Sequence, residues 1–69
     1  MTKVLAPLPG SVMIQHVEDG DRVEAGDLLL QIECMKMLND VQAPCAGVVR
    51  FLVPLGRVVG KGELVAEIT

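Results

Sequence analysis

The sequence predicts a small all-β domain: a flattened barrel or sandwich of two four-stranded antiparallel sheets with a pseudo-twofold internal repeat. Apolar residues make up 51% of the chain but include one aromatic, Phe51, so the core must be built from Val, Leu and Ile. Seven glycines and four prolines interrupt this β-branched material at short intervals, which favours short strands over helices. The chain also repeats one pattern twice. Neither copy alone could bury its apolar face, whereas packing the two copies together limits exposed strand edges.

The internal repeat extends over residues 4–68, with halves at about 4–33 and 41–69 of one domain that covers residues 1–69. Each copy has an Ala-Pro-x-x-Gly segment, a Val-x-x-Gly-x-x-Val-x-x-Gly segment and a final segment of alternating apolar residues. These segments begin at Ala6, Val17 and Leu28 in the first copy, and at Ala43, Val53 and Leu64 in the second. The copies are offset by 37 residues before Val17 and by 36 from there on, so the first copy contains one extra residue. We assign the extra residue to Gln15 or His16, as a β-bulge or a slightly longer turn.

Eight short strands are expected, at 4–6, 11–16, 22–23, 28–33, 38–42, 47–52, 57–58 and 63–68. The first stops just before Pro7 and the fifth just before Ala43-Pro44; both prolines suit strand entrances and edges, because proline has no N–H for the ladder. The second and sixth begin at or after a glycine, and the third and seventh lie between glycines. Matched glycines indicate turns with positive φ or a close approach of two backbone segments.

The fourth and eighth strands show the two-residue period of a half-buried strand. The residues assigned to the core face are Leu28, Leu30 and Ile32 in the first copy, and Leu64, Ala66 and Ile68 in the second. The residues assigned to the opposite face are Leu29, Gln31 and Glu33, and Val65, Glu67 and Thr69. The same face is apolar in both copies, so the strand register is well specified.

Charge and cysteine content narrow the function classes. The formal net charge is −3, which argues against a nucleic-acid partner, because such partners call for a basic face. Five acidic residues of the first copy are interpreted as a solvated loop: Glu18, Asp19, Asp21, Glu24 and Asp27. No segment resembles a signal peptide or approaches the length of a membrane span, and no membrane insertion is expected. Cys34 and Cys45 form neither a CxxC motif nor a disulfide framework, which favours a reducing compartment, most simply the cytoplasm.

The candidate site is Lys36, in the segment Glu33-Cys34-Met35-Lys36-Met37 that joins the two copies. This position puts Met35-Lys36 in a tight hairpin turn between the fourth and fifth strands. A lysine in a turn is most often only a solvated charge. The two methionines weaken that interpretation, because they expose apolar surface and their flexible thioethers suit recognition surfaces. A displayed primary amine is also a natural target for acylation.

The chain resembles the biotinyl domain of biotin-dependent carboxylases, as found in biotin carboxyl carrier proteins and the small biotinylated subunit of transcarboxylase. The resemblance rests on Glu-x-Met-Lys-Met, preceded by a Gly-Asp-x-Val-x-x-Gly loop (20–26) and followed by Ala-Pro-x-x-Gly (43–47). It covers nearly the whole chain. Cys34 stands where the family usually has alanine. The segment between Ile14 and Val17 has no room for the thumb that some carriers insert there, so a thumbless carrier is implied.

The resemblance implies a biotin carboxyl carrier, not an enzyme. Biotin protein ligase would join biotin to Lys36 through an amide. The biotin would then carry an activated carboxyl group from a biotin carboxylase to a carboxyltransferase subunit or domain, in a carboxylase, decarboxylase or transcarboxylase whose acceptor the sequence leaves open. Glu33, Met35 and Met37 would form the recognition surface around the site. No catalytic residue and no metal ligand are expected.

Three alternatives remain open on sequence alone. A lipoyl carrier has a closely similar fold, but its lysine usually stands in Asp-Lys-Ala rather than Met-Lys-Met. A Cu(I) site would use the soft ligands Cys34, Met35, Met37 and Cys45, although nothing in the sequence brings Cys45 close to Cys34. A structural or adaptor barrel that is never modified would leave Met-Lys-Met unexplained.

Overall fold

A computed structural model describes all 69 residues and contains only strands. The eight strands are β1 (Thr2–Leu5), β2 (Gly10–Gln15), β3 (Arg22–Val23), β4 (Leu28–Cys34), β5 (Met37–Gln42), β6 (Gly47–Phe51), β7 (Val58–Val59) and β8 (Leu64–Ile68). Each lies within two residues of its expected position. The structure contains no helix that could cross a membrane.

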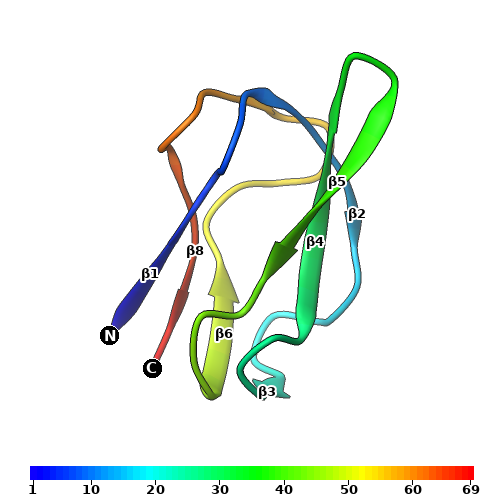
Figure 1. Ribbon diagram of the computed structural model, residues 1–69. Helices are drawn as coiled ribbons and strands as arrows, with labels where there is room; N and C mark the ends of the chain where they lie inside the picture. The colour runs from blue at the N-terminus through cyan, green and yellow to red at the C-terminus, as the bar shows by residue number, and fades with distance from the viewer.

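The strands form two antiparallel four-stranded sheets, β1-β8-β6-β3 and β5-β4-β2-β7, which pack face to face (Figure 1). The predicted fold class is confirmed. Each sheet takes strands from both copies of the repeat, so neither copy is a folding unit with its own sheet. The molecule measures 31 × 18 × 18 Å. Its two chain ends lie side by side, since Thr2 pairs with Ile68, and the β4–β5 hairpin projects at the other end (Figure 1).

The core lies between the sheets and consists of fifteen buried apolar residues, all aliphatic. The predicted two-residue alternation is wrong at Leu29 and Val65, which are fully buried rather than facing away from the core. It is also wrong at Leu28 and Leu64, which are only partly buried and pair with the exposed residues Gln42 and Leu5. The pairing of β4 with β5 skips Leu29, and the pairing of β1 with β8 skips Val65. A bulge at each site turns two consecutive side chains towards the core. The two bulges occupy equivalent positions in the two copies, which the period-two pattern did not reveal.

The extra residue of the first copy is Met13, not Gln15 or His16. The β2–β4 register passes from Val12↔Ile32 to Ile14↔Gln31, which leaves Met13 unpaired, whereas the equivalent β6–β8 ladder is regular from Val49↔Ile68 onward. Ile14 therefore corresponds to Arg50 and is exposed like it. Alternation of apolar residues cannot reveal this position, because Met13 and Ile14 are both apolar and both exposed.

The acidic loop is exposed, as expected, but three of its carboxylates have structural partners. Asp21 and Asp27 each accept a hydrogen bond from the backbone N–H three residues earlier, at 2.9 and 2.8 Å. Both close turns with a glycine in the third position, at φ near +90°. Asp19 accepts a 2.7 Å bond from the N–H of Phe51, which links the loop to the second copy. These carboxylates therefore hold the turns that connect the two sheets.

Candidate functional site

Lys36 lies in the two-residue turn of the β4–β5 hairpin. Cys34 and Met37 form the last cross-strand pair, and the turn residues Met35 and Lys36 have φ of 53° and 65°. Positive φ at both turn positions is the signature of a type I′ turn, whose twist matches that of the flanking strands. Neither residue is glycine, asparagine or aspartate, so this conformation costs about 1–2 kcal/mol per residue. The hairpin therefore adopts a conformation that its own turn residues disfavour.

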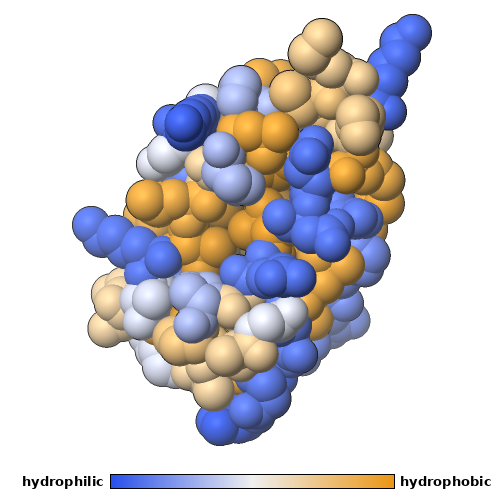
Figure 2. All heavy atoms as spheres, viewed as in Figure 1, coloured by the Kyte–Doolittle hydropathy of each residue, from blue (hydrophilic) through white to orange (hydrophobic).

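The turn is exposed on all sides. Met35 is 91% exposed and Met37 is 68% exposed. Lys36 is also exposed, and its amine forms no hydrogen bond or ion pair. Figure 2 shows apolar side chains beside a projecting hydrophilic one at the end of the molecule where Figure 1 places this hairpin. A free primary amine at an exposed tip fits attachment of an acyl group, because no contact has to break to make it available.

Glu33 lies just below the turn on the outer face of the sheet. It pairs laterally with Ser11 on β2 and Leu38 on β5, and all three point away from the core. The structure thus brings Met35, Lys36 and Met37 together at the tip. Glu33 belongs to the face below them, with no bond to the amine.

Two further residues support the hairpin: Asn39, which the sequence analysis did not single out, and Gly10, one of the matched glycines for which it predicted positive φ or a close backbone approach. The Asn39 side-chain amide donates to the carbonyls of Ile32 and Met37, at 3.3 and 3.1 Å. Gly10 lies so close to Glu33 that a Cβ added there would overlap the Glu33 carbonyl oxygen. The sequence carried a signal for each. Asparagine is disfavoured inside a strand, and Gly10 is matched by Gly47 in the second copy.

The structure does not bring together the four ligands that a Cu(I) site would need. Cys34 is at the turn, whereas Cys45 follows the far end of β5, a strand of six residues that spans about 20 Å. Both cysteines are free. No group of three His, Cys, Asp or Glu residues is arranged to hold a metal ion. His16 is exposed, and its Nε2 lies 2.8 Å from Oε1 of Gln31.

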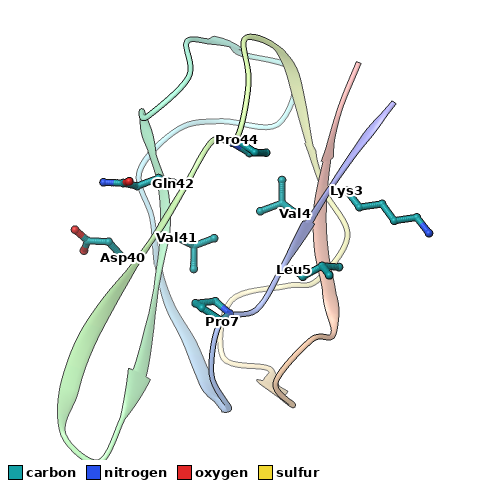
Figure 3. A pocket seen from close by; sticks show the side chains of 8 residues that line it. All are labelled: Lys3, Val4, Leu5, Pro7, Asp40, Val41, Gln42 and Pro44. Atoms are coloured by element: carbon teal, nitrogen blue, oxygen red, sulfur yellow. The ribbon is translucent and has the colours of Figure 1, made fainter.

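A groove of about 250 Å³ runs between the edge strands β1 and β5, away from the turn (Figure 3). Residues 37 apart in the repeat line it in matched pairs, among them Val4 with Val41 and Pro7 with Pro44. Figure 3 shows the two valines pointing towards each other and the Lys3 side chain pointing away. The groove brings no titratable groups together for chemistry. The hairpin tip, with its exposed amine, therefore remains the candidate site.

Comparison with known proteins identifies the family. The family described as "Biotin-requiring enzyme" matches residues 2–68. The gamma subunit of glutaconyl-CoA decarboxylase from Acidaminococcus fermentans is 53% identical over 38 residues, which are 55% of this chain and 26% of that protein. This chain therefore spans about a quarter of that relative's length.

Two solved structures share the fold. Urea carboxylase of Kluyveromyces lactis is 35% identical, with a TM-score of 0.90 over 97% of this chain and 6% of its own. The lipoyl domain of the 2-oxoglutarate dehydrogenase complex from Azotobacter vinelandii is 28% identical, with a TM-score of 0.81 over 100% of this chain and 96% of its own. Since the family match covers nearly every residue, the chain belongs to the family of biotin-requiring enzymes, within which it is a biotin carrier domain that performs no catalysis itself.

Proposed function

We propose that Lys36 is the attachment point of biotin, through an amide between the biotin carboxyl group and Nζ. The observation that carries this proposal is the position of Lys36 in an exposed two-residue turn with an unpaired amine. Lys3 and Lys61 are also exposed, but Lys3 lies on the edge strand β1 and Lys61 in a turn that lacks flanking methionines. Met35, Met37 and Glu33 form the surface that the modifying enzyme reads.

The domain acts as a mobile carrier. Biotin supplies a ureido nitrogen that can hold an activated carboxyl group. The protein's part is to present Lys36 at one end of a molecule 31 Å long, with both chain ends at the other. Any connection to a larger assembly therefore leaves the tip free to enter a second active site. Tethering of this kind replaces diffusive encounter with a high effective concentration.

The partners are inferred from chemistry and from relatives. We infer that biotin protein ligase modifies Lys36, and that the domain serves a biotin carboxylase and a carboxyltransferase site. The relatives include a decarboxylase subunit and a urea carboxylase, which is consistent with several acceptors for the carboxyl group. Two free cysteines are consistent with a reducing compartment such as the cytoplasm.

Intact mass spectrometry tests the attachment. Co-expression with a biotin protein ligase is expected to add one biotinyl group, and peptide mapping is expected to find it on Lys36. A lipoyl group on the same residue would instead assign the domain to the lipoyl carriers, which share its fold. Absence of both groups after co-expression with each ligase, or a label on Lys3 or Lys61, would overturn the proposal.

Moving the lysine by one position tests whether the ligase reads a displayed turn. The double variant Met35→Lys, Lys36→Met keeps the composition, and both positions have positive φ, so the fold should be unchanged. Adjacent turn residues aim their side chains differently, and a misplaced reacting group costs on the order of 100-fold in rate. We therefore expect a similar melting temperature and a loss of biotinylation rate of about 100-fold. If the shifted lysine were labelled as fast as Lys36 is in the protein without substitutions, turn geometry would not select the residue.

A further inference from the structure

The tip of the β4–β5 hairpin has little support from the rest of the fold. The β2–β4 ladder begins at the pair Ser11↔Glu33, so Cys34 and the turn residues have no ladder partner on β2. On the other side, β5 is the edge of its sheet. The turn residues Met35 and Lys36 are held at positive φ although neither is of a type that favours it. A conformation of this kind persists only where surrounding groups over-determine it.

Asn39 is the only side chain that bonds to the backbone of this hairpin. Its Nδ2 donates to Ile32 O at 3.3 Å and to Met37 O at 3.1 Å. These carbonyls belong to opposite strands, so one amide group ties β4 to β5 just below the turn. Met37 directly follows the turn, and its carbonyl is therefore fixed one residue from Lys36. Asn39 is half-buried on the inner side of the hairpin, opposite the face that carries Leu38 and Glu33.

The choice of residue at this position is difficult to explain by packing. Asparagine is depleted in strands, because its amide competes for backbone hydrogen bonds. At the equivalent position 37 residues earlier is Thr2, whose side chain forms no hydrogen bond. Thr2 pairs with Ile68 on β8, whereas Asn39 lies three residues after the displayed lysine of the β4–β5 hairpin. The two copies thus differ, with asparagine in place of threonine, at the position that lies beside the Lys36 turn.

We propose that Asn39 is a positioning residue for the modification of Lys36: it holds the Met35-Lys36 turn in the conformation that the modifying enzyme accepts. The inference rests on the proposed attachment at Lys36 and adds a residue that does not touch the incoming group. Without the two bonds, the turn samples other conformations. The apparent affinity for the enzyme then falls by the fraction of molecules that keep the competent turn. The catalytic step, once bound, is unchanged.

The test uses Asn39→Asp and Asn39→Leu. Both nearly preserve the side-chain shape and lose the donor, and only the first alters charge. Asn39→Thr is the conservative variant, because its hydroxyl can still donate to one carbonyl. Gln42→Ala, at an exposed position further along β5 with no contact to the turn, is the matched control. For each protein, NMR relaxation gives backbone order parameters at Met35 and Lys36, steady-state kinetics give KM and kcat for a biotin protein ligase, and a melting curve monitors the fold.

We expect order parameters at the turn to fall from about 0.85 to below about 0.6 in both donor-free variants. KM should rise about tenfold, the effect of losing hydrogen bonds of ordinary strength, with kcat unchanged. Asn39→Thr should give intermediate order parameters and an intermediate KM. Gln42→Ala should match the protein without substitutions in both. A rigid turn and an unchanged KM in Asn39→Leu would overturn the inference. So would a loss of kcat alone.

The two proposals can fail separately. If the protein without substitutions is not labelled on Lys36, the proposed attachment is wrong. The order parameters then still show whether Asn39 holds the turn. If the protein without substitutions is labelled and the donor-free variants are labelled equally well, only the proposed role of Asn39 is wrong. Should either variant fold poorly, its order parameters are measured below its melting temperature, and Asn39→Thr supplies the comparison.

Discussion

Lys36→Arg is expected to abolish biotin incorporation while leaving the fold unchanged. Arginine keeps the positive charge, but its delocalised guanidinium stays protonated and is a poor nucleophile towards an activated carboxyl group. Lys36 forms no hydrogen bond or ion pair in the structure, and surface substitutions of this kind change stability by no more than about 0.5 kcal/mol. Streptavidin capture after co-expression with the ligase should therefore vanish, with a melting temperature within about 4 °C of the unmodified protein.

Lys3→Arg and Lys61→Arg are the matched controls, because both lysines are also exposed and the substitution is the same. Each should be captured as efficiently as the unmodified protein. If the Lys36→Arg protein is still captured and the signal disappears only when Lys3 or Lys61 is also replaced, the hairpin is not the modification site. Because arginine keeps the positive charge of lysine, electrostatic attraction between the domain and the ligase is unchanged. A loss of capture therefore reports the missing amine.

Most of the fold follows from the sequence, because matched glycines and apolar positions repeat at a nearly constant offset. The positions of the three bulges do not: the change of offset indicated an extra residue in the first copy but not its place at Met13, and the other two bulges left no such sign. At Leu29 and Val65 the bulge places an additional residue in the core, so two neighbours are buried where alternation predicts one. At Met13 the bulge adds a residue on the exposed face. A bulge is decided by the pairing of two strands across the sheet, and a single strand's pattern carries no record of its partner's register.

The sequence likewise predicts some features of the candidate site and not others. The repeat alone predicts that Lys36 occupies the connection between two copies, and the methionines beside it are interpreted as a recognition surface. The chemistry of the attached group comes from family resemblance, since a displayed amine by itself accepts many acyl groups. For Asn39 the sequence carries only the anomaly of an asparagine inside a strand, because its two hydrogen bonds depend on carbonyls that come within reach only when β4 and β5 pair.

Gly10→Ala is expected to remove most of the stability of the domain, because the β4 backbone leaves no room for a side chain at Gly10. A Cβ at this position would overlap the carbonyl oxygen of Glu33 and lie 2.7 Å from Cγ2 of Ile32. Relieving the overlap requires moving backbone, and overpacking of this kind costs about 3 kcal/mol. A domain of this size has a total stability of only about 3–5 kcal/mol. The expected fall in melting temperature is about 12–24 °C.

Gly26→Ala separates this close approach from backbone strain. Gly26 has φ of 90°, but nothing lies within 4 Å of an added Cβ, so its substitution costs only the left-handed conformation, about 1–2 kcal/mol. Urea unfolding of the two variants should show the larger loss at Gly10. Because Glu33 lies three residues before Lys36, Gly10→Ala should also slow the ligase at temperatures where the protein remains folded, whereas Gly26→Ala should not. Equal losses of stability, with equal ligase rates, would mean that β4 moves away from Gly10 without consequence. The base of the lysine hairpin would then not be fixed by this contact.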